Sequence, residues 1–223
     1  MGKGSKKKNL VMLNLGSGYI GHDDWINIDY GILSLINKLP VLKKIIFGLK
    51  LAPQAYNKKW PKNLRRINLR RSFPFSDDSV DFVFTAHFIE HLDKHETVNL
   101  FKEVYRSLKP GGTIRILVPD LDTVVKHYQD NDDPIERVDV LNNHFWGVLP
   151  KQDTPPSFHT RFLSLFARGH NWLYNYDYMK KILMLSGFKA SKIKKCKFQK
   201  GKVPNIDFLD NHPDHSLIVE ATK

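Results

Sequence analysis

The chain is predicted to fold as a doubly wound α/β domain with a mostly parallel sheet, and three observations support this prediction. Short β-prone runs alternate with amphipathic helical stretches along most of the sequence, which is typical of βαβ units. The first apolar run, residues 10–15, ends directly at two glycines, as a buried strand entering a ligand-binding turn does. The length of 223 residues suits one such domain.

The elements follow from hydrophobic periodicity and from the positions of Pro and Gly. A helical stretch over residues 32–50 is interrupted at Pro40. A second helix over residues 94–108 is followed by the breaker residues 109–112, and a third over 176–186 is capped by Gly187. Seven segments are predicted as strands: residues 10–15, 25–29, 64–69, 80–85, 113–118, 188–197 and 215–222.

Composition places the chain among ordinary globular proteins, with 41% hydrophobic and 26% charged residues. The sequence shows neither an apolar run of about 20 residues nor a signal peptide, so we expect a cytoplasmic protein. Cys196 is the single cysteine and can form no internal disulfide. The net charge of +12 could attract an anionic partner. Many of the lysines lie in two segments: a predicted disordered tail, residues 1–9, and residues 189–202. The second segment is predicted as an edge strand that its lysines protect from aggregation.

The turn after the first strand has the features of a nucleotide-binding turn. Gly16 and Gly18 let the backbone approach a ligand closely, and Asp29 ends the second strand, where a carboxylate can accept hydrogen bonds from ribose hydroxyls. In dinucleotide-binding domains a helix separates the two features, and the acid lies about 20 residues on. Here residues 19–24 are too few for that helix. This spacing argues against a nicotinamide-binding domain and leaves one side of the pocket to be covered by residues 32–50 or 131–173.

Beyond this turn, the sequence resembles class I S-adenosylmethionine-dependent methyltransferases over nearly its whole length. The stretches that carry the resemblance are residues 13–18 (LNLGSG), 25–29 (WINID), 73–81 (FPFSDDSVD), 87–92 (HFIEHL) and 108–112 (LKPGG). Within that family it is similar to the small methyltransferases of polysaccharide and cell-surface glycan synthesis, through residues 118–121 (VPDL) and 170–172 (HNW). The resemblance implies a Rossmann-like, seven-stranded sheet with an antiparallel last strand.

The resemblance also implies S-adenosylmethionine as the cofactor and a set of residues that bind it. The glycine turn would hold the methionine part, Asp29 the ribose, Asn68 and Leu69 the adenine, and Thr85 and His87 would face the sulfonium. The residues implied are Leu15, Gly16, Ser17, Gly18, Asp29, Asn68, Leu69, Thr85 and His87. The methyltransferase domain would span residues 10–223, with residues 131–173, rich in aromatics, His and Pro, inserted as a substrate lid.

We expect O-methylation of a sugar hydroxyl in a glycan or glycan precursor. A neutral hydroxyl is a poor nucleophile, so a base must take its proton. His87 and Asp120 follow neighbouring strands and are the main candidates, with His91 third. His87 could instead line the pocket, His91 could pack on a helix and Asp120 could cap one. Glu90 is expected on a helix surface or as a cofactor-orienting residue. His87, His91 and Asp120 are of types that bind divalent ions, but we expect no metal.

Three alternatives to this function remain open. An RNA methyltransferase fits the charge but is disfavoured. Enzymes that methylate base amino groups carry Asn or Asp before Pro-Pro after the fourth strand, where residues 85–88 here read Thr-Ala-His-Phe. Methylation of a pyrimidine carbon needs a cysteine nucleophile near strands four to six, but Cys196 lies far from them, in the lysine-rich stretch. A small-molecule or lipid-linked acceptor, with peripheral membrane contact, fits the mixture of apolar residues and lysines over residues 32–50, although a helix packed on the sheet explains it too. A module without turnover is the third alternative, against which the intact glycine turn argues.

Overall fold

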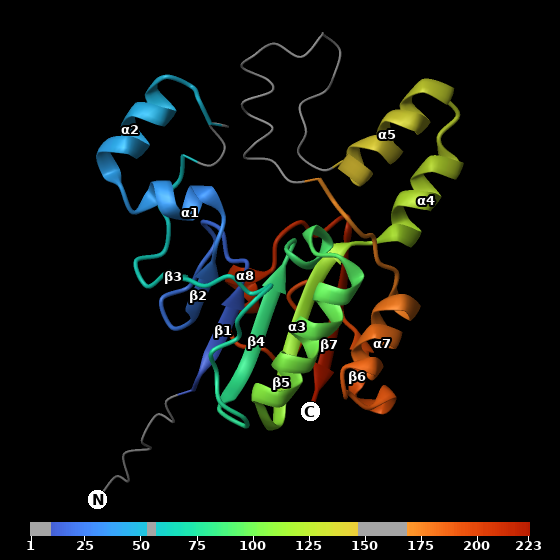
Figure 1. Cartoon of the computed structure of the whole chain (residues 1–223). Helices are drawn as coiled ribbons and strands as arrows, with labels where there is room; N and C mark the ends of the chain where they lie inside the picture. The colour runs from blue at the N-terminus through green and yellow to red at the C-terminus, as the bar shows by residue number, and fades with distance from the viewer. Residues whose placement is uncertain (1–9, 53–56, 147–168) are drawn as a thin grey trace, which may run out of the picture.

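The computed structural model describes residues 10–52, 57–146 and 169–223, with residues 143–146 described by their backbone alone. The predicted tail and residues 147–168 of the predicted insertion lie outside these ranges. The described residues form a seven-stranded sheet in the order β3-β2-β1-β4-β5-β7-β6 (Figure 1). The strands are β1 (Met12–Leu15), β2 (Ile26–Asp29), β3 (Arg65–Arg66), β4 (Val80–Ala86), β5 (Leu108–Pro119), β6 (Ile193–Lys195) and β7 (Ser216–Thr222).

The strand directions confirm the predicted fold class. The pairs β1–β2, β1–β4, β2–β3 and β4–β5 are parallel, whereas β7 pairs antiparallel with both β5 and β6. The carboxyl ends of the parallel strands therefore meet at one edge of the sheet. In an open α/β sheet this edge is where ligands bind.

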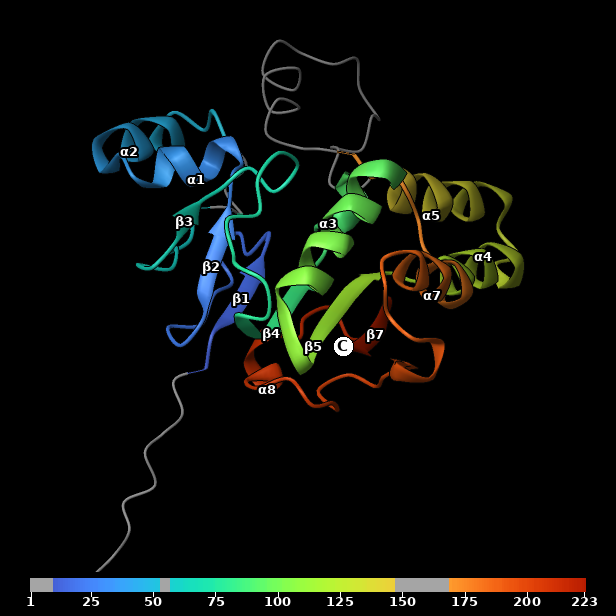
Figure 2. The same cartoon turned by 60° about the horizontal axis from the view of Figure 1, so that its bottom comes forward.

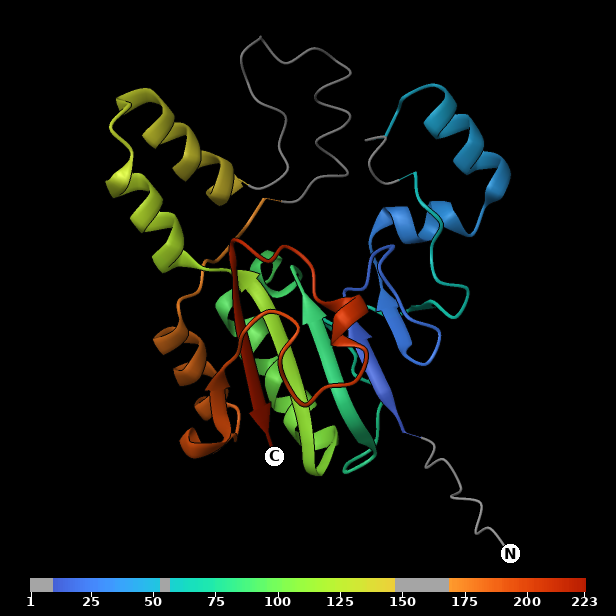
Figure 3. The same cartoon turned by 180° about the vertical axis from the view of Figure 1, so that it is seen from behind.

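Helices cover both faces of the sheet and extend past its ligand-binding edge. One face carries α3 (Lys94–Ser107) and α7 (Tyr176–Leu185), and the opposite face carries α8 (Ile206–Leu209) (Figures 1 and 3). The pairs α1–α2 and α4–α5 lie beyond the carboxyl ends of the strands, on opposite sides of the molecule (Figure 2). Their bounds are α1 (Ile32–Asn37), α2 (Pro40–Gly48), α4 (Leu121–Asp130) and α5 (Pro134–Trp146).

Three predicted elements differ in length from the observed ones. The strand predicted over residues 64–69 is only β3, because the chain turns at Asn68, whose carbonyl accepts from the backbone N–H groups of two following residues. The strand predicted over residues 188–197 is only β6, because η3 (Ala190–Lys192) precedes it. α3 ends at Ser107, and the predicted turn residues 109–112 belong to the irregular start of β5, where Gly111 has φ +84°.

A buried network of asparagines replaces the helix that usually connects the first two strands. Nδ2 of Asn14 on β1 donates to Oδ1 of Asn27 on β2 at 3.1 Å. Asn27 in turn donates to the carbonyl of Trp25 at 3.1 Å and to Oδ1 of Asn63 at 2.7 Å. These side chains satisfy backbone groups that a helix would otherwise pair. The prediction that residues 19–24 form no helix is confirmed.

The helix pair α1–α2 confirms the break at Pro40 but not a helix packed flat on the sheet. Only three of its residues, Ser34, Ile36 and Phe47, are buried. Many of its large apolar side chains are exposed instead: Ile32, Leu35, Leu39, Val41, Leu42, Ile45 and, just past α2, Leu49. A mixed apolar and lysine-bearing surface therefore stands beyond the carboxyl end of β2. No helix among the described residues has the length and apolar character needed to cross a membrane.

A fully buried arginine fixes the loop that covers the second face of the sheet. Arg115 on β5 pairs with Asp210 and with Glu220 of β7, at 2.9 Å for the latter. It also donates to the carbonyls of Lys197 and Lys200. Burial by itself lowers the pKa of Arg115, but the hydrogen bonds and charges of the two carboxylates raise it by more. The guanidinium is charged and joins residues 197–210 to the sheet.

Candidate active site

The end of β2 and the glycine turn after β1 are joined by a carboxylate. Oδ2 of Asp29 accepts from the backbone N–H of Gly18 at 3.0 Å, and Oδ1 accepts from that of Gly31 at 2.7 Å. Each carboxylate oxygen has a second lone pair for a ligand. Asp29 is therefore held beside the glycine turn, as its predicted ribose-binding role requires.

The two glycines of the turn serve different purposes. Both have left-handed backbones, with φ +67° at Gly16 and +53° at Gly18. A Cβ on Gly16 would stand 2.3 Å from the ring of Phe88, so this position is closed by packing. A Cβ on Gly18 would meet nothing within 4 Å. The open side of the turn is thus at Gly18, next to the Asp29 carboxylate.

Other residues predicted to bind the cofactor differ in how they could contact it. The side chains of Leu15 and Leu69 are buried in the main hydrophobic core, so Leu15 can offer only its backbone to a ligand. Oδ1 of Asn68 accepts from the N–H of Arg70 in the turn after β3. Thr85, near the end of β4, is 1% exposed, and its hydroxyl has no hydrogen-bond partner among the described residues. A buried hydroxyl without a partner at this edge is consistent with a polar ligand.

His87 follows β4 in a conformation that non-glycine residues rarely adopt, with φ +49°. Its Nδ1 lies 3.3 Å from Oε1 of Glu90, and its Nε2 lies 3.1 Å from Oγ of Ser216. The ring of His212 packs edge-on against it, with centroids 4.8 Å apart. Burial lowers the pKa of His212, and the neighbouring His87 lowers it further.

Glu90 was expected on a helix surface or as a cofactor-orienting residue, and the first of these positions is wrong. It lies in the short 3₁₀ turn η2 (Ile89–His91) and is completely buried. Neither carboxylate oxygen has a hydrogen-bond partner among the described residues. The available signal was its spacing of three residues from His87, which brings the two side chains together in a single turn. Burial could not be predicted because a turn has no periodicity that marks an inner face.

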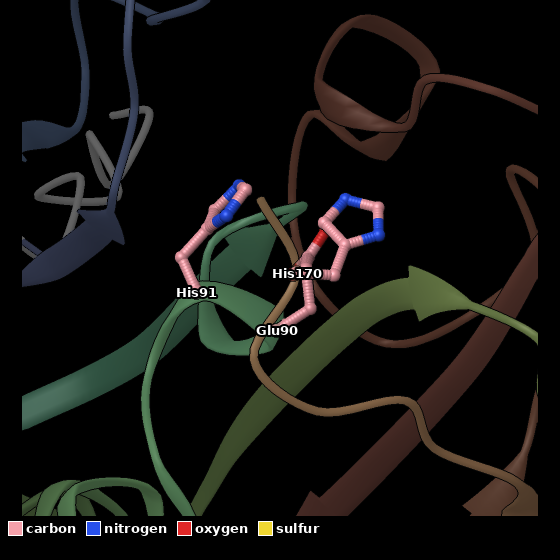
Figure 4. Close-up of side chains that lie close together, drawn as sticks. All are labelled: Glu90, His91 and His170. Carbon is pink, nitrogen blue, oxygen red and sulfur yellow. The ribbon is translucent and has the colours of Figure 1, made fainter. Parts of the chain in front are cut away.

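The segment before α7 is bound to this turn by main-chain hydrogen bonds. The backbone N–H groups of Asn171 and Trp172 donate to the carbonyl of Glu90 at 2.7 and 3.1 Å, and Nδ2 of Asn171 donates to the carbonyl of His91 at 2.9 Å. Nδ1 of His91 lies 3.1 Å from the carbonyl of Gly169. Residues 170–172, one of the stretches that carry the family resemblance, therefore lie beside η2. Figure 4 shows the side chains of Glu90, His91 and His170 at this place.

Asp120 makes the contacts that its capping alternative predicts. It caps α4, with Oδ1 accepting from the N–H of Asp122 at 3.2 Å, and Oδ2 lies 3.3 Å from Nζ of Lys195. The trio weighed as a metal site, which needed Asp120 beside His87 and His91, is not assembled in the described part of the chain. The charged partner of His87 is Glu90 instead.

Comparisons with known proteins agree with this architecture. Residues 39–116 match a family model described as a methyltransferase domain. No curated protein matches the chain in sequence. A solved structure named a possible exported protein from Bordetella parapertussis has a TM-score of 0.51 at 14% identity, with 96% of this chain and 62% of that one covered. This likeness supports the fold.

Two further solved structures give similar values. A SAM dependent methyltransferase from Archaeoglobus fulgidus has a TM-score of 0.49 and 17% identity, with 97% of this chain and 87% of that one covered. A "putative O-methyltransferase" from Nostoc punctiforme has a TM-score of 0.48 and 12% identity, with 98% of this chain covered. The chain spans about half the length of the Nostoc protein, of which 53% is covered.

The strand order is that of the predicted Rossmann-like fold, and the glycine turn with its carboxylate lies at the ligand-binding edge of the sheet. The methyltransferase-domain model matches residues 39–116, about a third of the chain, and these residues include β4 with His87 and Glu90. S-adenosylmethionine is the cofactor that the sequence resemblance implies. Asp29, the open side of Gly18 and the unpartnered hydroxyl of Thr85 fit this molecule, which carries ribose hydroxyls and a charged sulfonium.

Proposed function

We propose that this protein transfers the methyl group of S-adenosylmethionine to a hydroxyl oxygen, with a sugar hydroxyl of a glycan or glycan precursor as the acceptor. The observation that carries the proposal is the pair of His87 and the fully buried Glu90, 3.3 Å apart at the end of β4. An amine acceptor is nucleophilic once neutral, whereas a hydroxyl needs a base at hand. A histidine backed by a buried carboxylate is suited to that task.

In this proposal the proton is exchanged at Nδ1 of His87, and the hydrogen bonds of the ring support this choice. The hydroxyl of Ser216 donates to the carbonyl of His212 at 2.8 Å, so its oxygen accepts from Nε2–H of His87. Nδ1 is then the nitrogen that takes the acceptor's proton. The acceptor oxygen gives a lone pair to the methyl carbon, and the carbon–sulfur bond breaks with its electron pair on sulfur. Glu90 stabilises the imidazolium that results.

Asp120 is assigned a supporting part in this proposal. Asp120 holds the N-terminus of α4 and the side chain of Lys195, and so positions the helix pair α4–α5 at the acceptor side. The predicted lid over residues 131–173 lies only in part within the described residues, as α5 and the segment after residue 168. We assign the acceptor-binding role to α5 because this helix stands opposite α1–α2 at the same edge (Figure 2).

A lipid-linked acceptor is the second candidate, favoured by the exposed apolar side chains of α1–α2. They include Val41, 73% exposed, and Leu49, 65% exposed, with Lys43 and Lys44 between them. Such a surface can lie in the interface of an anionic bilayer. RNA remains the third candidate, on the net charge of +12 alone.

The test is methyl transfer from radiolabelled S-adenosylmethionine to glycan, lipid-linked glycan and RNA fractions. We expect label in glycan material, stable to base and lost on cleavage of methyl ethers. The lipid-linked arm is run with and without anionic vesicles, so that stimulation by vesicles favours the second candidate. Label confined to RNA, with a steep dependence on salt, would reject the proposal.

Asp29→Ala is expected to weaken S-adenosylmethionine binding by about 100-fold or more, since hydrogen bonds to a charged group contribute roughly 1.5–3 kcal/mol each and two would be lost. Calorimetric titration of the cofactor measures the loss. Asp24→Ala is the matched control, because Asp24 is an exposed acid on the neighbouring loop. Equal affinities for Asp29→Ala and the parent protein would remove Asp29 from the cofactor site.

A further inference from the structure

We propose that Glu90, His91 and His170 bind a divalent metal ion, which holds the acceptor hydroxyl next to His87. Each residue offers one ligand atom, and these atoms all lie within 4.8 Å of one another. Glu90 and His91 come from η2, and His170 comes from the segment that runs beside it (Figure 4). The role in the reaction rests on the proposed function, but the binding of the ion does not.

The donor set selects the kind of ion. One carboxylate oxygen and two imidazole nitrogens suit Zn²⁺, Mn²⁺ or Fe²⁺ better than Mg²⁺ or Ca²⁺, which prefer oxygen ligands. Ligand atoms about 2.1 Å from a tetrahedral zinc lie roughly 3.4 Å apart, so the ligand atoms, which lie within 4.8 Å of one another, need to approach by at most about 1.4 Å. Three protein ligands leave a coordination position for a substrate oxygen, as in catalytic zinc sites.

The charge of Glu90 points independently to a cation. The carboxylate is fully buried, and neither oxygen is hydrogen-bonded among the described residues, which is costly for an ionised group. A divalent ion bound by Glu90 would supply a counter-charge at this position. The burial of Glu90 and its lack of hydrogen bonds among the described residues therefore support a cation site independently of the distances between the ligand atoms.

The surroundings hold two of the ligands in place. Nδ1 of His91, 3.1 Å from the carbonyl of Gly169, donates its proton there and leaves the lone pair of Nε2 for a metal. The backbone carbonyls of Glu90 and His91 both accept from Asn171. Metal-binding histidines commonly donate their second nitrogen to a backbone carbonyl in this way.

A bound ion would act on the acceptor, whose hydroxyl takes the open position. Coordination lowers the pKa of a bound hydroxyl, as it does for zinc-bound water. The proton then passes to Nδ1 of His87, and the oxygen keeps the lone pair that forms the bond to the methyl carbon. Since the electron pair of the broken bond stays on sulfur, the step needs no oxidant or reductant.

The test is a calorimetric titration of the chelator-treated full chain with Zn²⁺. We expect one tight site, and a loss of affinity of at least about 100-fold in His170→Ala and Glu90→Gln, since even outer-shell changes cost 10–100-fold. His95→Ala is the matched control, because His95 is an exposed histidine on α3. Circular dichroism of each variant establishes that it is folded, and Glu90→Gln keeps the side-chain shape if His170→Ala does not fold.

Cobalt substitution gives a second readout, because a Co²⁺ ion bound by these ligands absorbs in the visible. We expect that absorption in the parent protein and its loss in His170→Ala. Zinc affinity and cobalt absorption unchanged in both site variants would overturn the metal site. Methyl transfer to a hydroxyl that survives chelation would remove the metal's role and leave the proposed function. Zinc binding by these residues in a protein that methylates no hydroxyl would leave the metal site and remove the proposed function.

Discussion

A His87→Asn variant is expected to transfer methyl groups about 10²–10⁴-fold more slowly than the parent protein, the usual contribution of a positioned base. Asparagine is the appropriate replacement because His87 has φ +49°, a region that asparagine tolerates better than most residues. The variant loses the ring nitrogen beside Glu90 but keeps the backbone of the turn. Single-turnover rates with saturating S-adenosylmethionine measure the effect on the transfer step.

Cofactor affinity is measured alongside the rate, because it distinguishes a catalytic base from a residue that only lines the cofactor pocket. Affinity for S-adenosylmethionine should change by less than about tenfold, or 1.4 kcal/mol. His95→Asn serves as the control and should keep the parent rate, since His95 is exposed on α3. A variant with full transfer rate on the true acceptor, or one whose whole defect is in cofactor binding, would contradict the assignment of His87 as the base.

Arg115→Met is expected to lower the free energy of unfolding by about 3–5 kcal/mol, the cost of leaving buried charges unpaired. The change removes the guanidinium between Asp210 and Glu220, both 6% exposed, and also its bonds to two loop carbonyls. Urea unfolding followed by circular dichroism measures the loss. Because Arg115 lies on the sheet and Asp210 follows α8, residues 197–210 should also become more susceptible to proteolysis.

Arg106→Met is the matched control for this prediction. Arg106 also meets two carboxylates, Asp77 and Glu103, but its side chain is 33% exposed. The hydrogen bonds of Glu103 and Asp77 raise its pKa, yet exposed pairs contribute roughly 0–1 kcal/mol because solvent screens them. A loss of stability in Arg115→Met no larger than that in Arg106→Met would show that the buried network is not what holds the loop.

The order of strands and helices could be predicted from the sequence alone, because hydrophobic periodicity and Pro and Gly positions are local signals. The break at Pro40, the strand ending at Leu15 and the absence of a helix over residues 19–24 are all observed. Asp29 beside Gly18 was predictable for a related reason. Residues that end neighbouring parallel strands meet at one edge once the strand order is known.

Features that depend on contacts between distant segments were decided by the tertiary structure. Nothing near Arg115 in sequence indicates that Asp210 and Glu220 will surround it. Likewise, Glu90 is buried because the segment around Asn171, some 80 residues later, lies over its turn. Sequence periodicity reports which face of an element is apolar, but not what will cover it. The sequence determined the fold class and the ligand-binding edge, whereas the pairing of His87 with Glu90, and the closeness of Glu90 to His170, required the folded chain.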